Sequence, residues 1–201
     1  MSKKMLVIFL FASIMILATS FTGCQKEVSP PQHLTMRWGI PEEVRGFEGL
    51  QREPEGAEVG LVNRNTLKVE WYLAEKYVLP ISATSEKEME GVRYKGSGIP
   101  AHLEFEWLNP WEEQWYALEE IPEEMIRAEI KEEDGMLSID FGPPEGADFE
   151  EGMTRVIWFR ITPTELEEFA FNIYGYLPKE EDPSRERVSN TLTLEAEVKK
   201  R

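Results

Sequence analysis

Apolar and polar residues alternate along much of the chain. Leu103, Phe105 and Trp107, for example, are separated from one another by single glutamates. This period of two predicts β-strands that bury one face against a core and expose the other, as in an antiparallel sheet. Five segments share the pattern: 34–40, 67–73, 102–108, 136–141 and 191–198.

A further strand and a turn are predicted from other local patterns. Segment 155–161, RVIWFRI, is apolar on both sides, which is typical of a central strand. Asp134-Gly135 directly precedes the strand at 136–141 and is a typical tight-turn pair.

Two segments predict helices. Residues 121–134 begin with a proline and several acids, which are favoured at a helix N-terminus. Residues 162–175 begin with Thr162 and Glu165 at the spacing of a capping box. The predicted fold is therefore α+β and β-rich. It is one domain, residues 34–201, with a single antiparallel sheet or sandwich and one or two short helices.

The first 23 residues predict an export signal. Lys3 and Lys4 are followed by the apolar stretch MLVIFLFASIMILA and then by small residues. This order is the layout of a secretory signal peptide. The apolar run of about 14 residues is shorter than the roughly 20 that a membrane-spanning helix needs.

Cys24 is the only cysteine of the chain and directly follows this segment, in the sequence FTGC. The sequence resembles the lipobox of bacterial lipoproteins, with Phe21 in place of the usual leucine. The resemblance implies cleavage between Gly23 and Cys24 and a diacylglyceryl group on the Cys24 thiol, with acyl chains such as palmitate. Two or three acyl chains hold a protein at a membrane stably, whereas one holds it marginally. A disulfide is the alternative, but the chain has no second cysteine.

The residues after Cys24 predict a location and a tether. Gln25, rather than aspartate, implies by the same resemblance the outer membrane of a Gram-negative envelope, facing the periplasm. In a bacterium with one membrane the anchor would hold the protein on the outer face of the cell. Residues 24–33 contain Pro30-Pro31 and predict a short extended tether to the domain.

The acidic charge of the chain excludes two classes of partner. The net charge is −16, and removal of Lys3 and Lys4 with the signal segment makes it −18. Binding to nucleic acid or to anionic lipid head groups needs a basic surface, so neither is expected. A negative charge favours solubility, or it attracts a basic partner or cations.

No catalytic or cofactor motif is present, and neither catalytic nor metal-binding residues are assigned. Ser97 lies five residues before His102, and a hydrolase could use such a pair, since a serine nucleophile needs a base. His33 falls in the predicted tether. Acidic pairs such as Glu112-Glu113 and Glu119-Glu120 are numerous, but none has the spacing of a calcium loop. Paired carboxylates could also hydrolyse glycosides, which depends on their spacing in the fold.

Aromatic residues are densest between residues 105 and 122. Pro110 interrupts the spacing of Trp107, Trp111 and Trp115, which predicts a strand, a turn at Asn109-Pro110 and a second extended piece from about residue 114. Trp107 then faces the core and Trp111 is the aromatic residue expected in solvent. Trp111, Trp115 and Tyr116 are the candidate binding surface, with core packing as the alternative.

Residues 99–126, IPAHLEFEWLNPWEEQWYALEEIPEEMI, resemble a segment in a family of uncharacterised bacterial envelope lipoproteins. The later VIWFRI strand and the lipobox agree with that layout. The resemblance implies an envelope lipoprotein and transfers no catalytic residue, and no cofactor other than the covalent lipid on Cys24.

Three functions follow as hypotheses. The first is a lipid-anchored, non-enzymatic envelope protein that presents its acidic domain to an envelope or secreted protein partner, in an immunity-type or accessory role. The second is a glycan or small-molecule binder that uses the exposed aromatics. The third is a hydrolase.

Overall fold

The computed structural model describes residues 33–39, 59–63, 65–122, 124–143, 147–178 and 186–201. The predicted signal segment, Gly23, Cys24 and all of the tether except His33 lie outside these ranges. His33 is already tied into the domain, because its backbone N–H donates to the Val188 carbonyl at 2.8 Å.

Fourteen strands are described, together with one short 3-10 helix, η2 (Leu118–Glu120). The strands are β1 (Leu34–Trp38), β2 (Val59–Asn63), β3 (Thr66–Tyr72), β4 (Tyr77–Ser85), β5 (Met89–Glu90), β6 (Arg93–Pro100), β7 (Leu103–Asn109), β8 (Gln114–Ala117), β9 (Arg127–Glu133), β10 (Met136–Gly142), β11 (Asp148–Phe149), β12 (Thr154–Pro163), β13 (Glu168–Leu177) and β14 (Glu186–Lys199).

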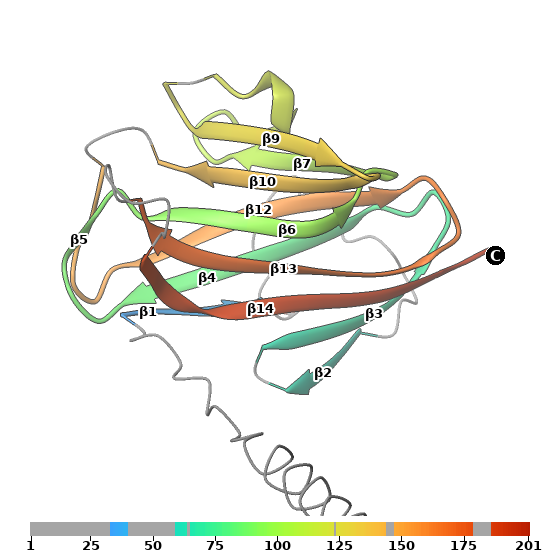
Figure 1. The fold of residues 1–201 in the computed structure, drawn as a ribbon, viewed down its shortest axis with the longest axis horizontal. Helices are drawn as coiled ribbons and strands as arrows, with labels where there is room; N and C mark the ends of the chain where they lie inside the picture. The colour runs from blue at the N-terminus through green and yellow to red at the C-terminus, as the bar shows by residue number, and fades with distance from the viewer. Residues whose placement is uncertain (1–32, 40–58, 64, 123, 144–146, 179–185) are drawn as a thin grey trace, which may run out of the picture.

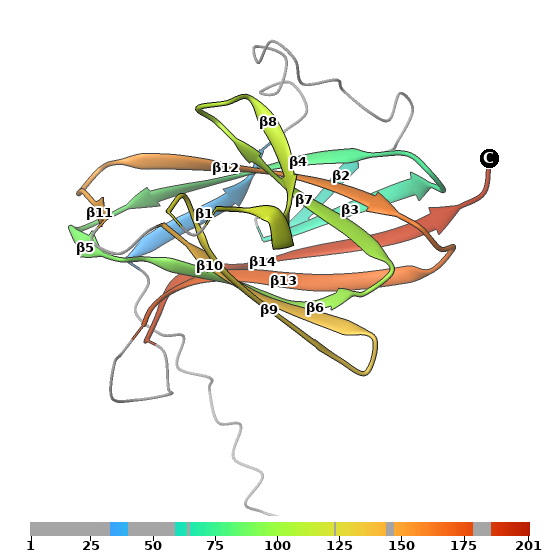
Figure 2. The same ribbon diagram turned by 90° about the horizontal axis from the view of Figure 1, so that it is seen from above.

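Twelve of the strands form one sheet in the order β8-β7-β12-β4-β1-β14-β13-β6-β10-β9, with β3 also paired to β14 and β2 to β3. The sheet curls back on itself, so that β12 and β4 lie in one layer and β14, β13 and β6 in the other (Figures 1 and 2). Strand β1 joins the two layers by pairing with β4 on one side and β14 on the other. Strands β5 and β11 form a separate small pair.

The strand predictions are confirmed. Each of the five alternating segments contains a strand, although Ile40 of the first segment lies outside the described residues, and segment 155–161 lies within β12, between β4 and β7. The Asp134-Gly135 turn is present between β9 and β10. The sheet is mixed rather than antiparallel, because β14 pairs in parallel with both β1 and β3.

Both predicted helices are wrong. Segment 121–134 contains strand β9, which the tight turn places antiparallel to β10. Segment 162–175 spans the end of β12 and most of β13, where Phe169, Phe171 and Ile173 alternate into the core. Pairing of β13 with β6 and β14 satisfies its backbone on both sides, so the tertiary context overrides the local helix signals.

The core between the layers contains aromatic rings from both layers. Phe105 and Phe159 from one layer lie 4.9 Å apart between ring centroids, and Phe105 meets Phe171 of the other layer at 6.1 Å. Each such ring removes roughly 150–250 Å² from water, which allows a core without disulfides. Within the residues that the structure describes, none of the helical segments has the length and apolar character needed to cross a bilayer.

Candidate functional site

The β7–β8 tip, defined as residues 110–113, is a turn between two paired strands. The side chain of Asn109 is fully buried and accepts a hydrogen bond from the Trp111 backbone N–H at 3.0 Å. Glu113 closes the turn with a positive φ of 54°. Asn109 therefore fixes the path of the turn from below, and the residues above it are presented to solvent.

Trp111 is the most exposed large apolar residue among those described, with 75% of its surface accessible. Pro110, Glu112 and Glu113 around it are also exposed. Because Trp111 lies in a turn rather than on a strand, no neighbouring strand covers its indole ring. An aromatic ring on an acidic rim suits recognition of a partner.

Trp115 lies on the outer face of the sheet and is half-buried. It packs against a small outer cluster formed by Leu108 and Trp158. The Arg160 guanidinium lies 4.7 Å from the centre of its ring and is held by two 2.5 Å hydrogen bonds to Glu106. This arrangement couples β7, β8 and β12 and keeps much of Trp115 from solvent.

Tyr116 points to the opposite face of β8 and packs against the main core. Its hydroxyl donates a hydrogen bond to the Glu112 carboxylate. That bond holds the pKa of the Tyr116 phenol above its usual value, because ionisation would break it, and partial burial and the charge of Glu112 act in the same direction. The three candidate residues therefore do not form one continuous face, and Trp111 alone is openly accessible.

The Ser97–His102 pair considered for hydrolysis is not formed. Ser97 lies within β6, in register with Asn172 and Ser138. His102 lies in the turn after β6, and its imidazole faces two carboxylates instead.

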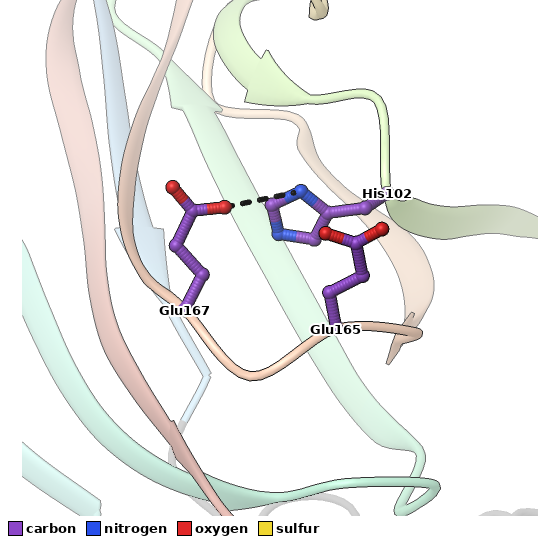
Figure 3. Close-up of side chains that lie close together, drawn as sticks. All are labelled: His102, Glu165 and Glu167. Carbon is purple, nitrogen blue, oxygen red and sulfur yellow. Dashed lines mark ion pairs between the residues drawn. The ribbon is translucent and has the colours of Figure 1, made fainter.

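His102, Glu165 and Glu167 form a cluster that sequence reasoning missed (Figure 3). Their ligand-type atoms all lie within 4.8 Å of one another, and His102 Nδ1 is 3.4 Å from Glu167 Oε2. Within the described ranges it is the one group of three or more such side chains close enough to hold a metal ion. The predicted helix over 162–175 includes both glutamates, whereas they lie in the connection from β12 to β13, which bends at Glu165. No local signal pointed to the cluster, because His102 and the two glutamates are more than sixty positions apart in the chain.

Most of the acidic runs are exposed, as expected of a solvated face. This holds for Glu112-Glu113, Glu119-Glu120 and the run from Glu132 to Asp134. A pocket of about 560 Å³ beside the β5–β11 pair is also acidic. Its lining includes Glu88, Glu90, Glu150 and Glu151.

No protein-family model matches the chain, and no curated protein matches its sequence. A family 123 glycoside hydrolase from Clostridium perfringens is 11% identical, with a TM-score of 0.40, over 85% of this chain and 28% of its own. This chain therefore spans less than a third of that enzyme. A PapD-like domain of human CEP192 is 9% identical, with a TM-score of 0.35, over 77% of this chain and 94% of its own. A non-cellulosomal cohesin from Archaeoglobus fulgidus is 10% identical, with a TM-score of 0.31, over 70% of this chain and 88% of its own. Similarities this low assign neither a family nor an activity.

Proposed function

We propose that this chain is a lipid-anchored, non-enzymatic envelope lipoprotein whose β-rich domain binds another protein through the β7–β8 tip. The observation that carries the proposal is the exposed indole of Trp111, 75% accessible on a turn that the buried Asn109 holds in place. An exposed tryptophan in a fixed position loses little conformational freedom on binding, and such residues dominate the energy of many interfaces.

The place of the tip in the fold supports this function. In Figure 2, β8 lies above the layer of β12 and β4, whereas β1 begins below that layer, at the left. The proposed lipid on Cys24 precedes β1 in the chain. A domain anchored from that side presents the β7–β8 tip away from the membrane, where a partner can reach it.

The surroundings of Trp111 indicate the chemistry of the partner. Glu112 and Glu113 are exposed beside it, in a chain with a net charge of −16. A partner surface with an apolar pocket and a basic rim would complement the tip and associate rapidly at low salt. An immunity-type role, in which an anchored acidic domain blocks an incoming toxin, is one form of this function. The proposed location is the outer membrane facing the periplasm, or the outer face of a single cell membrane.

The test is crosslinking of intact cells of the native host that express the full-length tagged protein, followed by mass spectrometry. Expected is one dominant protein that the wild type and Leu73→Ala capture and that Trp111→Ala loses. Leu73 is a matched control because it is a partly exposed apolar residue, 38% accessible, at the end of β3. Cys24→Ala should be absent from the membrane fraction and should no longer capture an envelope-bound partner. Equal capture by Trp111→Ala would contradict the proposed surface.

Glycan binding is a second candidate, because an open indole ring can also stack on a sugar ring. It predicts that soluble envelope glycans quench tryptophan fluorescence of the wild type and leave Trp111→Ala unchanged. Quenching by a glycan without any captured protein would favour this function over the first.

A further inference from the structure

We propose that His102, Glu165 and Glu167 bind a divalent transition-metal ion, with Zn²⁺ as the case that the ligands favour. The cluster lies where two connections of the sheet meet: His102 is in the β6–β7 turn, and both glutamates are in the β12–β13 connection (Figure 3). Both connections run between the two layers of the curled sheet. An ion at this point would link them to each other.

Hydrogen bonds to its carbonyl and packing of its ring hold His102 in place. The His102 carbonyl accepts hydrogen bonds from the backbone N–H and the hydroxyl of Thr164, which binds the turn to the connection that carries the glutamates. The His102 ring meets the edge of Phe169 at 6.5 Å, and its side chain is only 14% exposed. A ligand fixed by its surroundings loses less freedom when it binds an ion.

The carboxylates are free to reach the imidazole. Glu165 and Glu167 are exposed, and neither pairs with a lysine or arginine in the part of the chain that the structure describes. Two carboxylates this close repel each other, and a divalent cation between them would remove that repulsion. The distance of 3.4 Å from His102 Nδ1 to Glu167 Oε2 is longer than an ordinary hydrogen bond. It matches the separation of about 3.4 Å between two ligands of a tetrahedral zinc ion with bonds of about 2.1 Å.

The ligand set selects the type of ion. Calcium and magnesium take oxygen ligands almost exclusively, whereas zinc and its neighbours in the first transition row bind imidazole nitrogen together with carboxylate oxygen. The other ring nitrogen, Nε2, is buried and has no hydrogen-bond partner among the described residues. Because no donor among the described residues faces Nε2, this nitrogen can carry the single proton of the neutral imidazole. The Nδ1 lone pair is then available to the ion. Three protein ligands leave the fourth position of a tetrahedral ion to water.

The test is titration of the full-length chain, in detergent micelles and after treatment with a chelator, with ZnCl2 by isothermal titration calorimetry. Expected is one high-affinity Zn²⁺ per chain and no comparable binding of Ca²⁺ or Mg²⁺. Glu165→Gln, Glu167→Gln and His102→Gln should each weaken Zn²⁺ binding at least about tenfold, because even residues behind a metal ligand contribute that much. Zn²⁺ should also raise the melting temperature of the wild type and not of these variants.

The matched control is Glu168→Gln, which removes an exposed acid next to the cluster that is not one of its three members. It should bind Zn²⁺ as the wild type does. If His102→Gln does not fold, the two exposed glutamate variants decide the outcome. All variants keep Cys24, so the loss of binding cannot come from its thiol. Absence of Zn²⁺ binding in the wild type would overturn the site. So would Zn²⁺ affinities of Glu165→Gln and Glu167→Gln that equal the affinity of the wild type.

Discussion

The side-chain amide of Asn190 hydrogen-bonds both backbone groups of Met36: its Oδ1 accepts from the N–H at 2.7 Å and its Nδ2 donates to the carbonyl at 2.9 Å. Strands β1 and β14 share only one register pair, Leu34 with Ser189, at the point where the two layers of the sheet join. The amide thus replaces the strand-to-strand hydrogen bonds that a longer parallel pairing would supply. The adjacent Ser189 hydroxyl accepts from the Gly175 N–H at 2.5 Å, at the register shift of β13.

Asn190→Ala should therefore be strongly destabilising. The variant leaves two buried backbone groups of Met36 without these partners, at about 1–3 kcal/mol each, so we expect a loss of about 2–6 kcal/mol in the free energy of unfolding. Urea denaturation monitored by tryptophan fluorescence measures it. Asn172→Ala is the control: the Asn172 side chain is exposed and, among the described residues, accepts a hydrogen bond from the Thr193 hydroxyl alone, so its loss should cost less than about 1 kcal/mol. Equal losses in the two variants would show that Asn190 does not hold the junction.

Arg160→Lys should loosen the outer face of the sheet around Trp115. Lysine cannot form the two parallel hydrogen bonds to Glu106 and stacks less well on the indole, so we expect a loss of about 1 kcal/mol and a red shift of tryptophan emission. Lys68→Gln removes the ion pair with Glu195, whose side chains are 58% and 44% exposed, and should change stability by less than about 0.5 kcal/mol. An unchanged emission spectrum in Arg160→Lys would contradict the stacking.

Tyr94 makes the stability of the fold sensitive to alkaline pH. Burial raises the pKa of its phenol, and its hydroxyl has no hydrogen-bond partner among the described residues. The unfolded chain releases this proton near the usual pKa of about 10. The folded state then binds more protons, and stability should fall as the pH rises above about 10.

Tyr94→Phe tests this relationship. At pH 7 it removes a buried hydroxyl without a partner and should stabilise the fold by about 1 kcal/mol, while the stack on Phe141 is retained. Denaturation midpoints between pH 7 and pH 11 should fall less steeply in the variant than in the wild type. A variant that is less stable at pH 7 would show that the hydroxyl does have a favourable partner.

Gly135→Ala should weaken the β9–β10 hairpin through the backbone alone. Asp134 and Gly135 have φ angles of 52° and 72° in a two-residue loop that pairs Glu133 with Met136. An added Cβ at Gly135 meets nothing within 4 Å, so the expected cost of about 1–2 kcal/mol comes from the left-handed conformation. Asp134→Asn is the control and should leave thermal stability nearly unchanged, because asparagine tolerates this conformation. Equal stability of Gly135→Ala and the wild type would contradict the assigned turn.

Local sequence determined most of the strands and one candidate site residue. In β7 the alternation of Leu103, Phe105 and Trp107 specifies which side is buried, because successive side chains of a strand point to opposite faces. Pro110 ends that strand and places Trp111 in a turn, so its exposure also followed from neighbouring residues. The turn at Asp134-Gly135 has the same local origin, since few residues accept a positive φ.

Only the tertiary structure decided the rest. Segment 162–175 satisfies a helical and an alternating pattern at once, and the backbone hydrogen bonds of β6 and β14 selected the strand. The approach of His102 to Glu165 and Glu167 joins residues more than sixty positions apart, because two connections between the layers meet at one place. The junction of Asn190 with Met36 spans 154 positions. A sequence pattern specifies which face of a segment is buried, but it carries no information about which distant segment will cover that face.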